Sequence, residues 1–247
     1  MRPWRVKLGA LFVTLSFVAA CSAPASHPRP ARHSTAVLHQ ASLRPDIVPR
    51  SSWHADEKAV HGKPVYDTKI MAVFVHHTDG PNDYDCARDV PAILRTIEDH
   101  HIHAMGWDDI GYNFAVDRCG TIYEGRAGGV DRAVMGAHTE GFNAHSVGIA
   151  ALGHFGEGVK VPRPMLRAIA AIAAWKLDPG IDPRGRVRLV SSNNASRFRK
   201  GTTADLNVIS GHRDVFQTDC PGQALYDALP WIRQEAAQLR RKATWAA

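Results

Sequence analysis

Three side chains in this sequence could together hold a catalytic metal ion: His76, His212 and Cys220. His76 follows the apolar run of residues 70–75, and the other two lie eight residues apart in a segment bounded by glycine, residues 211–222. Two imidazoles and one thiolate are a sufficient ligand set for zinc, because catalytic zinc sites use three protein ligands and leave a fourth position open. A water molecule in that position has a pKa of about 7, so the set predicts a hydrolase.

Each of these residues also has a simpler interpretation. A single histidine at a strand end is usually structural, and His77 competes with His76 because neighbouring residues on a strand point to opposite faces. His212 could lie on the surface and Cys220 could be a buried, inert thiol. Alternatively, Cys220 could be a nucleophile that His212 activates. The chain has no His-Glu-x-x-His sequence, so metalloprotease chemistry carried by one helix is not supported.

The surrounding segments predict strands that alternate with helices. Residues 70–75 and 147–152 are continuous apolar runs, typical of strands covered on both faces. Residues 178–204 are polar with Gly and Pro, and indicate a long excursion without regular structure. The pattern predicts an α/β fold with helices on the faces of a sheet. The other expected elements are strands over 112–116, 121–124 and 206–209, and helices over 92–104, 165–177 and 223–241, the last broken at Pro230.

Length and composition suit one large domain plus targeting material, or two small domains. The chain has 247 residues, of which 45% are apolar, enough for a hydrophobic core. Its formal net charge of +6 favours acidic partners such as an anionic wall polymer, anionic lipid or nucleic acid. No block of lysine and arginine with interleaved aromatic residues occurs, so we expect no nucleic acid partner.

The amino-terminal residues predict export. Residues 1–7 carry three positive charges, and residues 8–20 are mostly apolar but too short to span a bilayer. The sequence before Cys21 resembles a bacterial lipobox, in which Cys21 would be acylated and anchor the protein to a membrane. The alternative is an ordinary signal cleaved near residues 21–25. Either way we expect an extracellular protein, released or anchored by lipid.

The expected organisation is an export signal at residues 1–21, a flexible tether at 22–44 and one folded domain at 45–242. The cysteines agree with export. Cys86 and Cys119 are used by neither the signal nor the metal site, and they can pair in an oxidising compartment. Their bridge would stabilise the fold by about 3–4 kcal/mol by the chain-entropy argument. Two free thiols are the alternative.

Five motifs occur in an order that resembles a known family. Together they resemble the peptidoglycan recognition protein family, the type 2 zinc N-acetylmuramoyl-L-alanine amidases, over roughly three quarters of the chain. The long segment after residue 177 resembles the secreted bacterial branch. The resemblance implies a single α/β domain with a central mixed sheet, about three main helices and zinc in a groove. The motifs span residues 75–78, 106–114, 122–126, 136–143 and 211–222.

The resemblance implies specific zinc ligands. The first histidine of the His-His-Thr motif is a ligand in the family, hence His76 rather than His77, together with His212 and Cys220. Family members without amidase activity typically lack the cysteine, so Cys220 favours an enzyme over a receptor. One departure from the family occurs near the start, where His54 replaces the usual glycine of a turn.

Two further residues are expected to assist catalysis. Tyr112 matches a family tyrosine beside the metal, whose hydroxyl could hold the attacking water or donate to the developing oxyanion. Packing of Tyr112 in the core is the alternative. Thr218 stands where phage relatives carry a catalytic lysine, and because threonine supplies no charge we expect at most one hydrogen bond from it. No carboxylate is clearly placed as a general base.

The resemblance also implies contacts with substrate. A Gly-Trp pair at the position of Trp107, with an arginine matching Arg126, resembles the versions that prefer diaminopimelate-type stem peptides, since a guanidinium can grip the extra carboxylate. Core packing of Trp107 and an ion pair of Arg126 with Glu124 or Asp131 are the alternatives. The candidate substrate contacts are His101, Trp107, Arg126, His138 and Asn143.

The sequence therefore predicts a zinc hydrolase that cleaves the amide bond between N-acetylmuramic acid and L-alanine in peptidoglycan. The alternative is a non-catalytic peptidoglycan-binding module. Peptidoglycan is the expected partner, a lipid on Cys21 is the only expected membrane contact, and we expect a monomer.

Overall fold

The apolar run that precedes His76 forms the central strand of a sheet. β1 (Ala72–His77) pairs in parallel with β4 (Ser146–Ala151) on one side and with β7 (Ile209–Gly211) on the other. Its first four residues are fully buried, as expected of a parallel strand covered on both faces. The strand extends two residues beyond its predicted end, because both histidines continue the pairing with β4.

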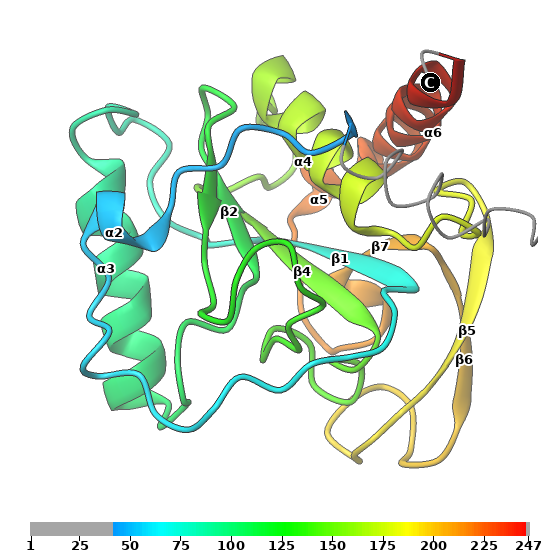
Figure 1. Cartoon of the computed structure of the whole chain (residues 1–247), viewed down its shortest axis with the longest axis horizontal. Coiled ribbons are helices and arrows are strands. Elements are labelled where there is room, and N and C mark those ends of the chain that lie inside the picture. The colour runs from blue at the N-terminus through cyan, green and yellow to red at the C-terminus, as the bar shows by residue number, and fades with distance from the viewer. Residues whose placement is uncertain (1–41, 246–247) are drawn as a thin grey trace, which may run out of the picture. The chain divides into compact units, whose positions relative to one another are not determined.

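The sheet is mixed, as predicted. The structure is a computed structural model that describes residues 42–245, and within them five strands follow the order β3-β2-β4-β1-β7 (Figure 1). β2 (Phe114–Val116) runs parallel to β4, and β3 (Ile122–Glu124) runs antiparallel to β2. The expected export signal and nearly all of the expected tether lie outside the described residues. No helix in the described part of the chain has the length and apolar character needed to cross a bilayer.

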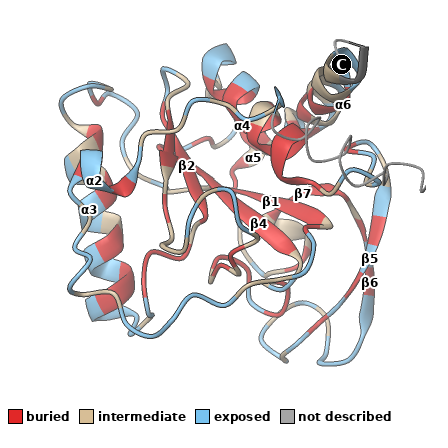
Figure 2. Ribbon diagram, viewed as in Figure 1, coloured by how far each residue is buried: buried red, intermediate tan, exposed pale blue. Residues whose placement is uncertain are grey.

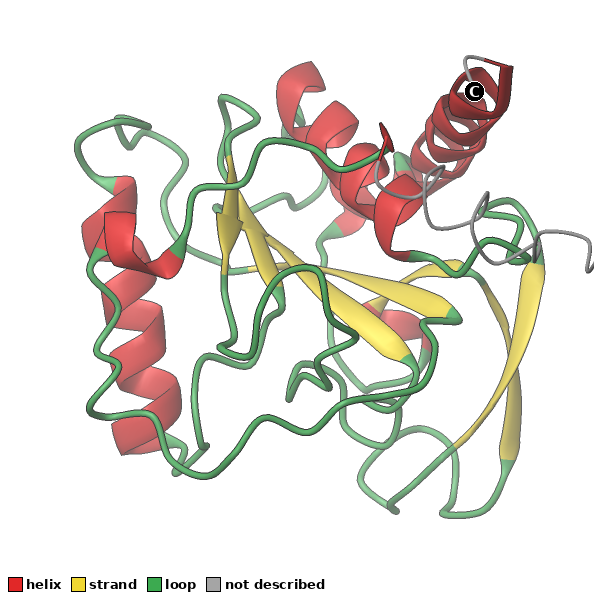
Figure 3. Cartoon of the chain, viewed as in Figure 1, coloured by secondary structure: helices red, strands yellow, loops and turns green. Residues whose placement is uncertain are grey.

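Helices cover both faces of this sheet (Figures 1 and 3). α3 (Val90–Asp99) continues as the π-helix η1 (His100–Ala104) and packs with α2 (Arg50–Trp53) over one face. α4 (Arg163–Lys176) and α6 (Leu229–Trp245) pack over the other face. Alternate residues of β2 and β3 enter the two core clusters, as strand geometry requires. The predicted α/β class with about three main helices is therefore confirmed.

α4 shows why its residues form a core helix. Met165, Ile169, Ile172 and Ala173 recur at helical spacing, and all four are fully buried (Figure 2). Burying each of the three larger side chains contributes about 1.5–3 kcal/mol relative to leaving it exposed. The helix ends at Lys176, one residue before the predicted end.

The segment expected to lack regular structure instead contains a second sheet. β5 (Arg186–Val190) and β6 (Thr203–Asn207) pair antiparallel as a separate two-stranded sheet (Figure 3). The expectation was wrong because charged residues on the solvent face hide the alternation: Val187 and Leu189 are buried while their neighbours are exposed (Figure 2). The single strand predicted over residues 206–209 is divided between β6 and β7.

Pro230 lies in the first turn of a helix rather than interrupting one. α5 (Gln223–Asp227) ends before it, and Pro230 is the second residue of α6. A proline in the first helical turn loses no hydrogen bond, because the N–H groups there have no partner within the helix. The prediction of two helical pieces is confirmed. They are separated at residue 228, two residues before Pro230, where the break was expected.

Two local features concern the amino-terminal half. Cys86 and Cys119 form the predicted disulfide, with Cα atoms 6.4 Å apart. His54, the residue that replaces a family glycine, ends α2 with a left-handed backbone conformation, φ 58°. Glycine adopts that conformation without strain, which explains why the family usually has glycine at this turn. In this chain His54 adopts the same left-handed conformation.

Candidate metal centre

His76, His212 and Cys220 come together at the carboxyl ends of two adjacent strands. His76 lies in β1, and His212 directly follows β7, the neighbour of β1. The ligand atoms of the three residues all lie within 4.8 Å of one another, and Cys220 Sγ lies 3.8 Å from His76 Nδ1. In a tetrahedral zinc site with ordinary bond lengths, such a nitrogen and sulfur would be about 3.6 Å apart. Both the donor set and its spacing therefore fit zinc.

The turn that carries Cys220 is held by its own hydrogen bonds. The backbone N–H of Arg213 donates to the carbonyl of Cys220 at 2.9 Å, and its guanidinium donates to the carbonyl of Asp219 at 2.9 Å. Gly222 adopts φ 85°, and a Cβ there would lie 2.2 Å from the carbonyl oxygen of Phe155. Only glycine fits this close approach, so the sequence after Cys220 fixes how the cysteine returns to the strand ends.

The ring of His76 is supported on the side away from Cys220. Its Nε2 lies 3.2 Å from Thr139 Oγ1 and 3.3 Å from His138 Nδ1. A histidine that binds metal through Nδ1 needs an acceptor for its Nε2–H, and these atoms supply one. Asn143 Oδ1 accepts the backbone N–H groups of both residues, and Gly148 leaves the space that the His138 ring fills, since a Cβ there would lie 2.2 Å from it.

His138 and Asn143 are thus placed as supports of His76. His138 is only 5% exposed, and the side-chain oxygen of Asn143 is already engaged by backbone. Their predicted contact with substrate stays a prediction.

Burial sets the charge of the ligand side chains. It lowers the pKa of His76 well below the ordinary value and lowers the pKa of His212 to about 4, so both imidazoles are neutral near pH 7. Burial also raises the pKa of the Cys220 thiol to about 12. Against this, the N–H of His77 donates to Cys220 Sγ at 3.4 Å, which favours the thiolate. The neutral imidazoles are ready to bind a cation, and a bound cation would favour loss of the thiol proton.

A row of aromatic rings leads away from His76. The ring of Tyr112 lies 5.3 Å from that of His76 and 5.4 Å from that of His101, and the His101 ring lies 4.6 Å from that of Trp107. Gly111 N–H donates to His101 Nδ1 at 3.1 Å, and burial lowers the pKa of His101 to about 4. His101 is therefore neutral at pH 7 with its proton on Nε2. Trp107 is partly exposed, so it is not a core residue.

Arg126 forms neither of the ion pairs considered from sequence. The carboxylates of Glu124 and Asp131 bind other groups of the protein. The guanidinium of Arg126 instead donates to the carbonyl of Ile110 at 3.3 Å and lies 3.9 Å from the carboxylate of Asp108. Its side chain is 14% exposed. These contacts fix the guanidinium while leaving part of it open to a ligand.

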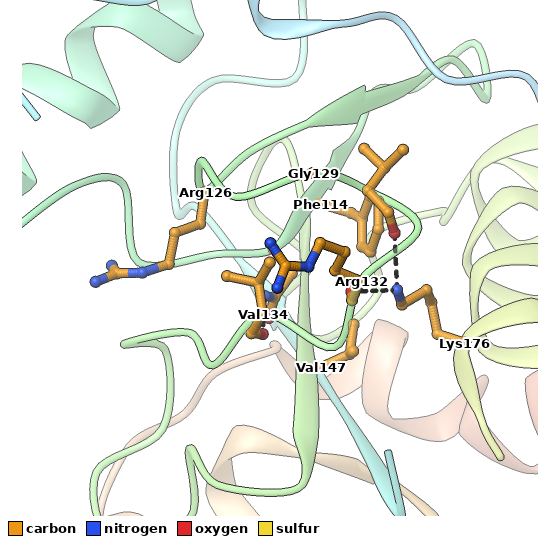
Figure 4. Close-up of a pocket in the computed structure, with 9 residues that line it drawn as sticks. Phe114, Arg126, Gly129, Arg132, Val134, Val147 and Lys176 are labelled. Atoms are coloured by element: carbon orange, nitrogen blue, oxygen red, sulfur yellow. Dashed lines mark hydrogen bonds between the residues drawn. The ribbon is translucent and has the colours of Figure 1, made fainter. Parts of the chain in front are cut away.

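The loop that carries Arg126 is held from two sides. Asp109 accepts the N–H of Ala127 at 2.6 Å through one oxygen and the guanidinium of Arg50 at 3.2 Å through the other. From α4, the buried Lys176 donates to two carbonyl oxygens of the same loop, both at 2.7 Å (Figure 4). Figure 4 also shows Arg126 extending away from Lys176. The position of Arg126 therefore depends on the buried charged side chains of Arg50, Asp109 and Lys176.

Comparison with known proteins assigns the family. Residues 66–223 match the family described as N-acetylmuramoyl-L-alanine amidase (Amidase_2). The chain belongs to this family. Peptidoglycan-recognition protein SC2 of Drosophila simulans is 29% identical over 192 residues, which cover 77% of this chain and 88% of that protein. The N-acetylmuramoyl-L-alanine amidase of Homo sapiens is 31% identical over 188 residues, which cover 75% of this chain but 28% of the human protein.

Solved structures agree with this assignment. A variant of Drosophila PGRP-LB in complex with tracheal cytotoxin matches with a TM-score of 0.57 and 28% identity, covering 74% of this chain and 92% of that one. Human PGRP-IBETAC in complex with glycosamyl muramyl pentapeptide matches with a TM-score of 0.56 and 28% identity, covering 75% of this chain and 95% of that one. The predicted fold and family are confirmed. The amidase family thus includes both recognition proteins and amidases.

Thr218 and a nearby histidine pair have local roles in this amidase-family chain. Thr218 Oγ1 accepts the N–H of Cys220 at 3.2 Å, so it helps to hold the turn. Asp79 Oδ1 lies 2.5 Å from His154 Nδ1 and 3.9 Å from His77 Nε2. Phe155 N–H donates to the other nitrogen of His77 at 3.4 Å, which leaves the His77 proton facing the carboxylate. Asp79 therefore binds two imidazoles in a group that is satisfied without a metal.

Sequence reasoning missed three supporting residues of the candidate site. Thr139 contacts His76, Asp109 holds the Arg126 loop, and the ring of Phe216 stacks on His212 at 5.1 Å between centroids. Thr139 and Asp109 lie inside motifs that were recognised, so the signal for a polar support was present. Phe216 lies within the last motif, residues 211–222, but as an apolar residue it gave no signal for a contact with His212.

Proposed function

We propose that this chain is a zinc-dependent N-acetylmuramoyl-L-alanine amidase. It would hydrolyse the amide bond that joins the lactyl group of N-acetylmuramic acid to L-alanine in peptidoglycan. The observation that supports this proposal is the convergence of His76, His212 and Cys220, whose ligand atoms lie within 4.8 Å of one another in a chain of the amidase family. Bound zinc would supply a Lewis acid for the amide carbonyl and lower the pKa of a water molecule to about 7.

Neighbouring residues hold the three proposed ligand side chains in orientations that suit metal binding. Thr139 and His138 lie within hydrogen-bond distance of Nε2 of His76, so Nδ1 of the same ring is left to bind the cation. Phe216 stacks on His212, and the N–H of His77 stabilises Cys220 as a thiolate. Such supporting contacts typically change metal affinity or activity by about 10–100-fold when they are removed.

Tyr112 is the residue best placed to assist the chemistry. Burial, reinforced by the nearby Cys220, raises the pKa of Tyr112, so its hydroxyl keeps its proton at neutral pH. We infer that this hydroxyl donates a hydrogen bond to the amide carbonyl oxygen as negative charge develops on it. Removing one such donor typically costs about 10²–10³-fold in kcat. The neutral His101, whose ring lies 5.4 Å from that of Tyr112, carries a second N–H donor on its Nε2.

Arg126 and Trp107 are proposed to select the stem peptide. The fixed, partly exposed guanidinium of Arg126 suits a carboxylate, and Trp107 offers a partly exposed flat wall. A relative, peptidoglycan recognition protein LE, is 28% identical and was solved with tracheal cytotoxin, described as a monomeric diaminopimelic acid-type peptidoglycan. We therefore propose that the substrate carries a diaminopimelate-type stem peptide. We also propose that the protein is exported and acts outside the cell, where a lipid on Cys21 would anchor it to a membrane.

A thiol hydrolase is the weaker alternative. A cysteine nucleophile must be a thiolate, and reactive cysteines have depressed pKa values. Burial here raises the pKa of Cys220 to about 12. Cys220 Sγ lies 3.8 Å from Nδ1 of His76, and among the described residues it forms no hydrogen bond with His212, the base that this alternative requires.

The test measures metal and product together. Purified protein should hold one zinc ion per chain and release free stem peptide from defined muropeptides, as identified by mass spectrometry. Cys220→Ser should abolish both zinc retention and peptide release, whereas His103→Asn, a change of an exposed histidine in η1, should leave both intact. Full activity of Cys220→Ser would refute the zinc assignment. Binding of muropeptide without any release by the wild type would indicate a binding module instead.

A further inference from the structure

The β5–β6 hairpin places its connecting loop against the metal-centre segments. Ser192 N–H donates to the carbonyl of Gly141 at 2.9 Å, and Arg197 N–H donates to the carbonyl of Val215 at 2.8 Å. The ring of Phe198 meets that of Phe142 edge to face, 5.7 Å between centroids. We call residues 191–200 the hairpin loop.

These contacts connect the hairpin loop to the segment that supports His76 and to the segment that carries His212. Gly141 and Phe142 lie between Thr139, which contacts His76, and Asn143, which fixes the backbone of Thr139. Val215 lies between His212 and Phe216, the ring that stacks on His212. The hairpin loop therefore borders the centre and is held to it through backbone hydrogen bonds.

The hairpin loop carries uncompensated positive charge. Arg197, Arg199 and Lys200 are exposed, and residues 191–203 contain no acidic residue. Among the described residues none of these three side chains forms an ion pair, whereas Arg186 of the same hairpin pairs with Asp205. The loop's cations are thus available to a ligand.

The sheet order separates this charge from Arg126. Arg126 follows β3 at one edge of the sheet β3-β2-β4-β1-β7, whereas the hairpin loop is anchored to the segment after β7 at the other edge. The ligand set formed by His76 and His212 lies between them, at the ends of β1 and β7. Arg126 and the cations of the hairpin loop therefore lie toward opposite edges of the sheet, with the ligand set between them.

The composition of the glycan strand limits which anions the cations of the hairpin loop can bind. If the stem peptide extends toward Arg126, the glycan extends toward the hairpin loop. The lactyl carboxyl of the muramic acid is consumed in the scissile amide, and N-acetylated sugars carry no charge, so an unmodified strand is neutral there. Apart from the carboxylates of neighbouring stem peptides, which both kinds of strand carry, an anion on that side is a substituent of the sugar. A phosphodiester is an anionic group that Arg and Lys recognise well.

We propose that the hairpin loop is a subsite for glycan strands that carry phosphodiester-linked anionic polymers. This inference rests on the proposed amidase function and adds a preference for decorated walls. Binding through three exposed cations raises local substrate concentration and weakens as salt screens the charges. The expected preference is about fivefold to tenfold at low ionic strength, since exposed ion pairs are individually weak.

The test compares two wall preparations. One retains its phosphodiester-linked polymers, and the other has had them removed with hydrofluoric acid. The triple variant Arg197→Gln, Arg199→Gln, Lys200→Gln should lose about fivefold to tenfold in kcat/KM on decorated walls, through KM, and should match the wild type on stripped walls. The control variant Arg184→Gln with Arg186→Gln removes one cation of β5 and one just before it, both already paired with aspartates, and should keep the preference.

Several outcomes would refute the subsite. Equal losses on both walls would mean that the loop acts on the centre itself, and no loss on either would mean that its charges bind nothing. Binding to anionic lipid vesicles that depends on the three cations, without a preference for decorated walls, would assign the loop to membranes. Sedimentation with walls separates this proposal from the amidase proposal, because the three cations should increase binding to decorated walls even if no peptide is released.

Discussion

The two sides of the proposed metal centre are built differently. On the Arg126 side, buried charged groups fix the structure: Arg50 pairs with Asp109, which also holds the Arg126 loop, and Lys176 anchors the same loop. On the hairpin side, two backbone hydrogen bonds and one aromatic contact hold a loop whose charges all face solvent.

This difference predicts that substitutions on one side should affect folding stability and those on the other should affect ligand binding. A side chain that is buried and paired cannot change without leaving a partner unsatisfied, so substitutions on the Arg126 side should cost stability. Exposed and unpaired charges can change with little effect on folding, so substitutions on the hairpin side should alter binding alone. The following predictions test that contrast.

The largest loss of stability is expected from Asp109→Ala. Removal of this carboxylate leaves the buried guanidinium of Arg50 short of one partner and the N–H of Ala127 without its acceptor. We expect the free energy of unfolding to fall by about 3–5 kcal/mol, measured by urea denaturation. Asp108→Ala, a change of the exposed neighbouring aspartate, is the control and should cost less than about 0.5 kcal/mol. Equal effects of the two variants would contradict the buried network.

Loss of the disulfide should cost slightly less. The double variant Cys86→Ser, Cys119→Ser opens a covalent loop with a sequence separation of 33 residues. The free energy of unfolding should fall by about 3–4 kcal/mol because the unfolded chain gains conformational freedom. Peptide release by the folded variant should be unchanged, since neither cysteine contacts the metal centre. Unchanged thermal stability would show that the bridge adds nothing to this side of the molecule.

Lys176 should make stability depend on pH. Burial lowers its pKa to about 8 in the folded protein, against 10.5 for an ordinary lysine. Between these values the unfolded chain binds more protons than the folded one, so the contribution of Lys176 to stability rises with pH. Its two carbonyl partners favour the charged form and moderate the effect, which we place at about 1–3 kcal/mol.

The measurement compares wild type with Lys176→Met at pH 7.5 and pH 10. Other groups that titrate in this range are common to both proteins and cancel in the difference. The stability of the wild type relative to the variant should increase from the lower pH to the higher. A constant or falling difference would show that the lysine pKa is not lowered in the folded state.

The smallest effect is expected on the hairpin side. Replacing Arg197, Arg199 and Lys200 with glutamine should change the free energy of unfolding by no more than about 0.5 kcal/mol, because all three side chains are exposed. Chemical denaturation would measure it beside the wall-binding experiment. A loss of 2 kcal/mol or more, on the order of a buried-group effect, would remove the contrast between the two sides.

The sequence predicted the parts whose pattern is strong. The run before His76 and the helical spacing of Met165 and Ile169 gave the central strand and a core helix, and the unused cysteine pair gave the disulfide. Residue chemistry suggested the ligand trio, the family resemblance chose His76 over His77, and the structure brings the three ligand atoms together.

The parts that were missed depend on tertiary contacts. The β5–β6 sheet was overlooked because Val187 and Leu189 alternate with exposed arginines in a polar segment, so its hydrophobic signal is short and weak. The support of His76 by Thr139 joins residues 63 positions apart, and no local pattern predicts such a contact. His138, expected at the substrate, is packed against that same ring.

The ligand set spans most of the polypeptide. Cys220 follows His76 by 144 residues, and their meeting requires β1 to be paired with β7, which is one of the last strands in the chain. No early fragment of the protein can bring the three proposed ligands together during synthesis. If the chain binds zinc as proposed, zinc loading would be one of the final events of maturation, and retained zinc would report that the whole domain had reached its native state.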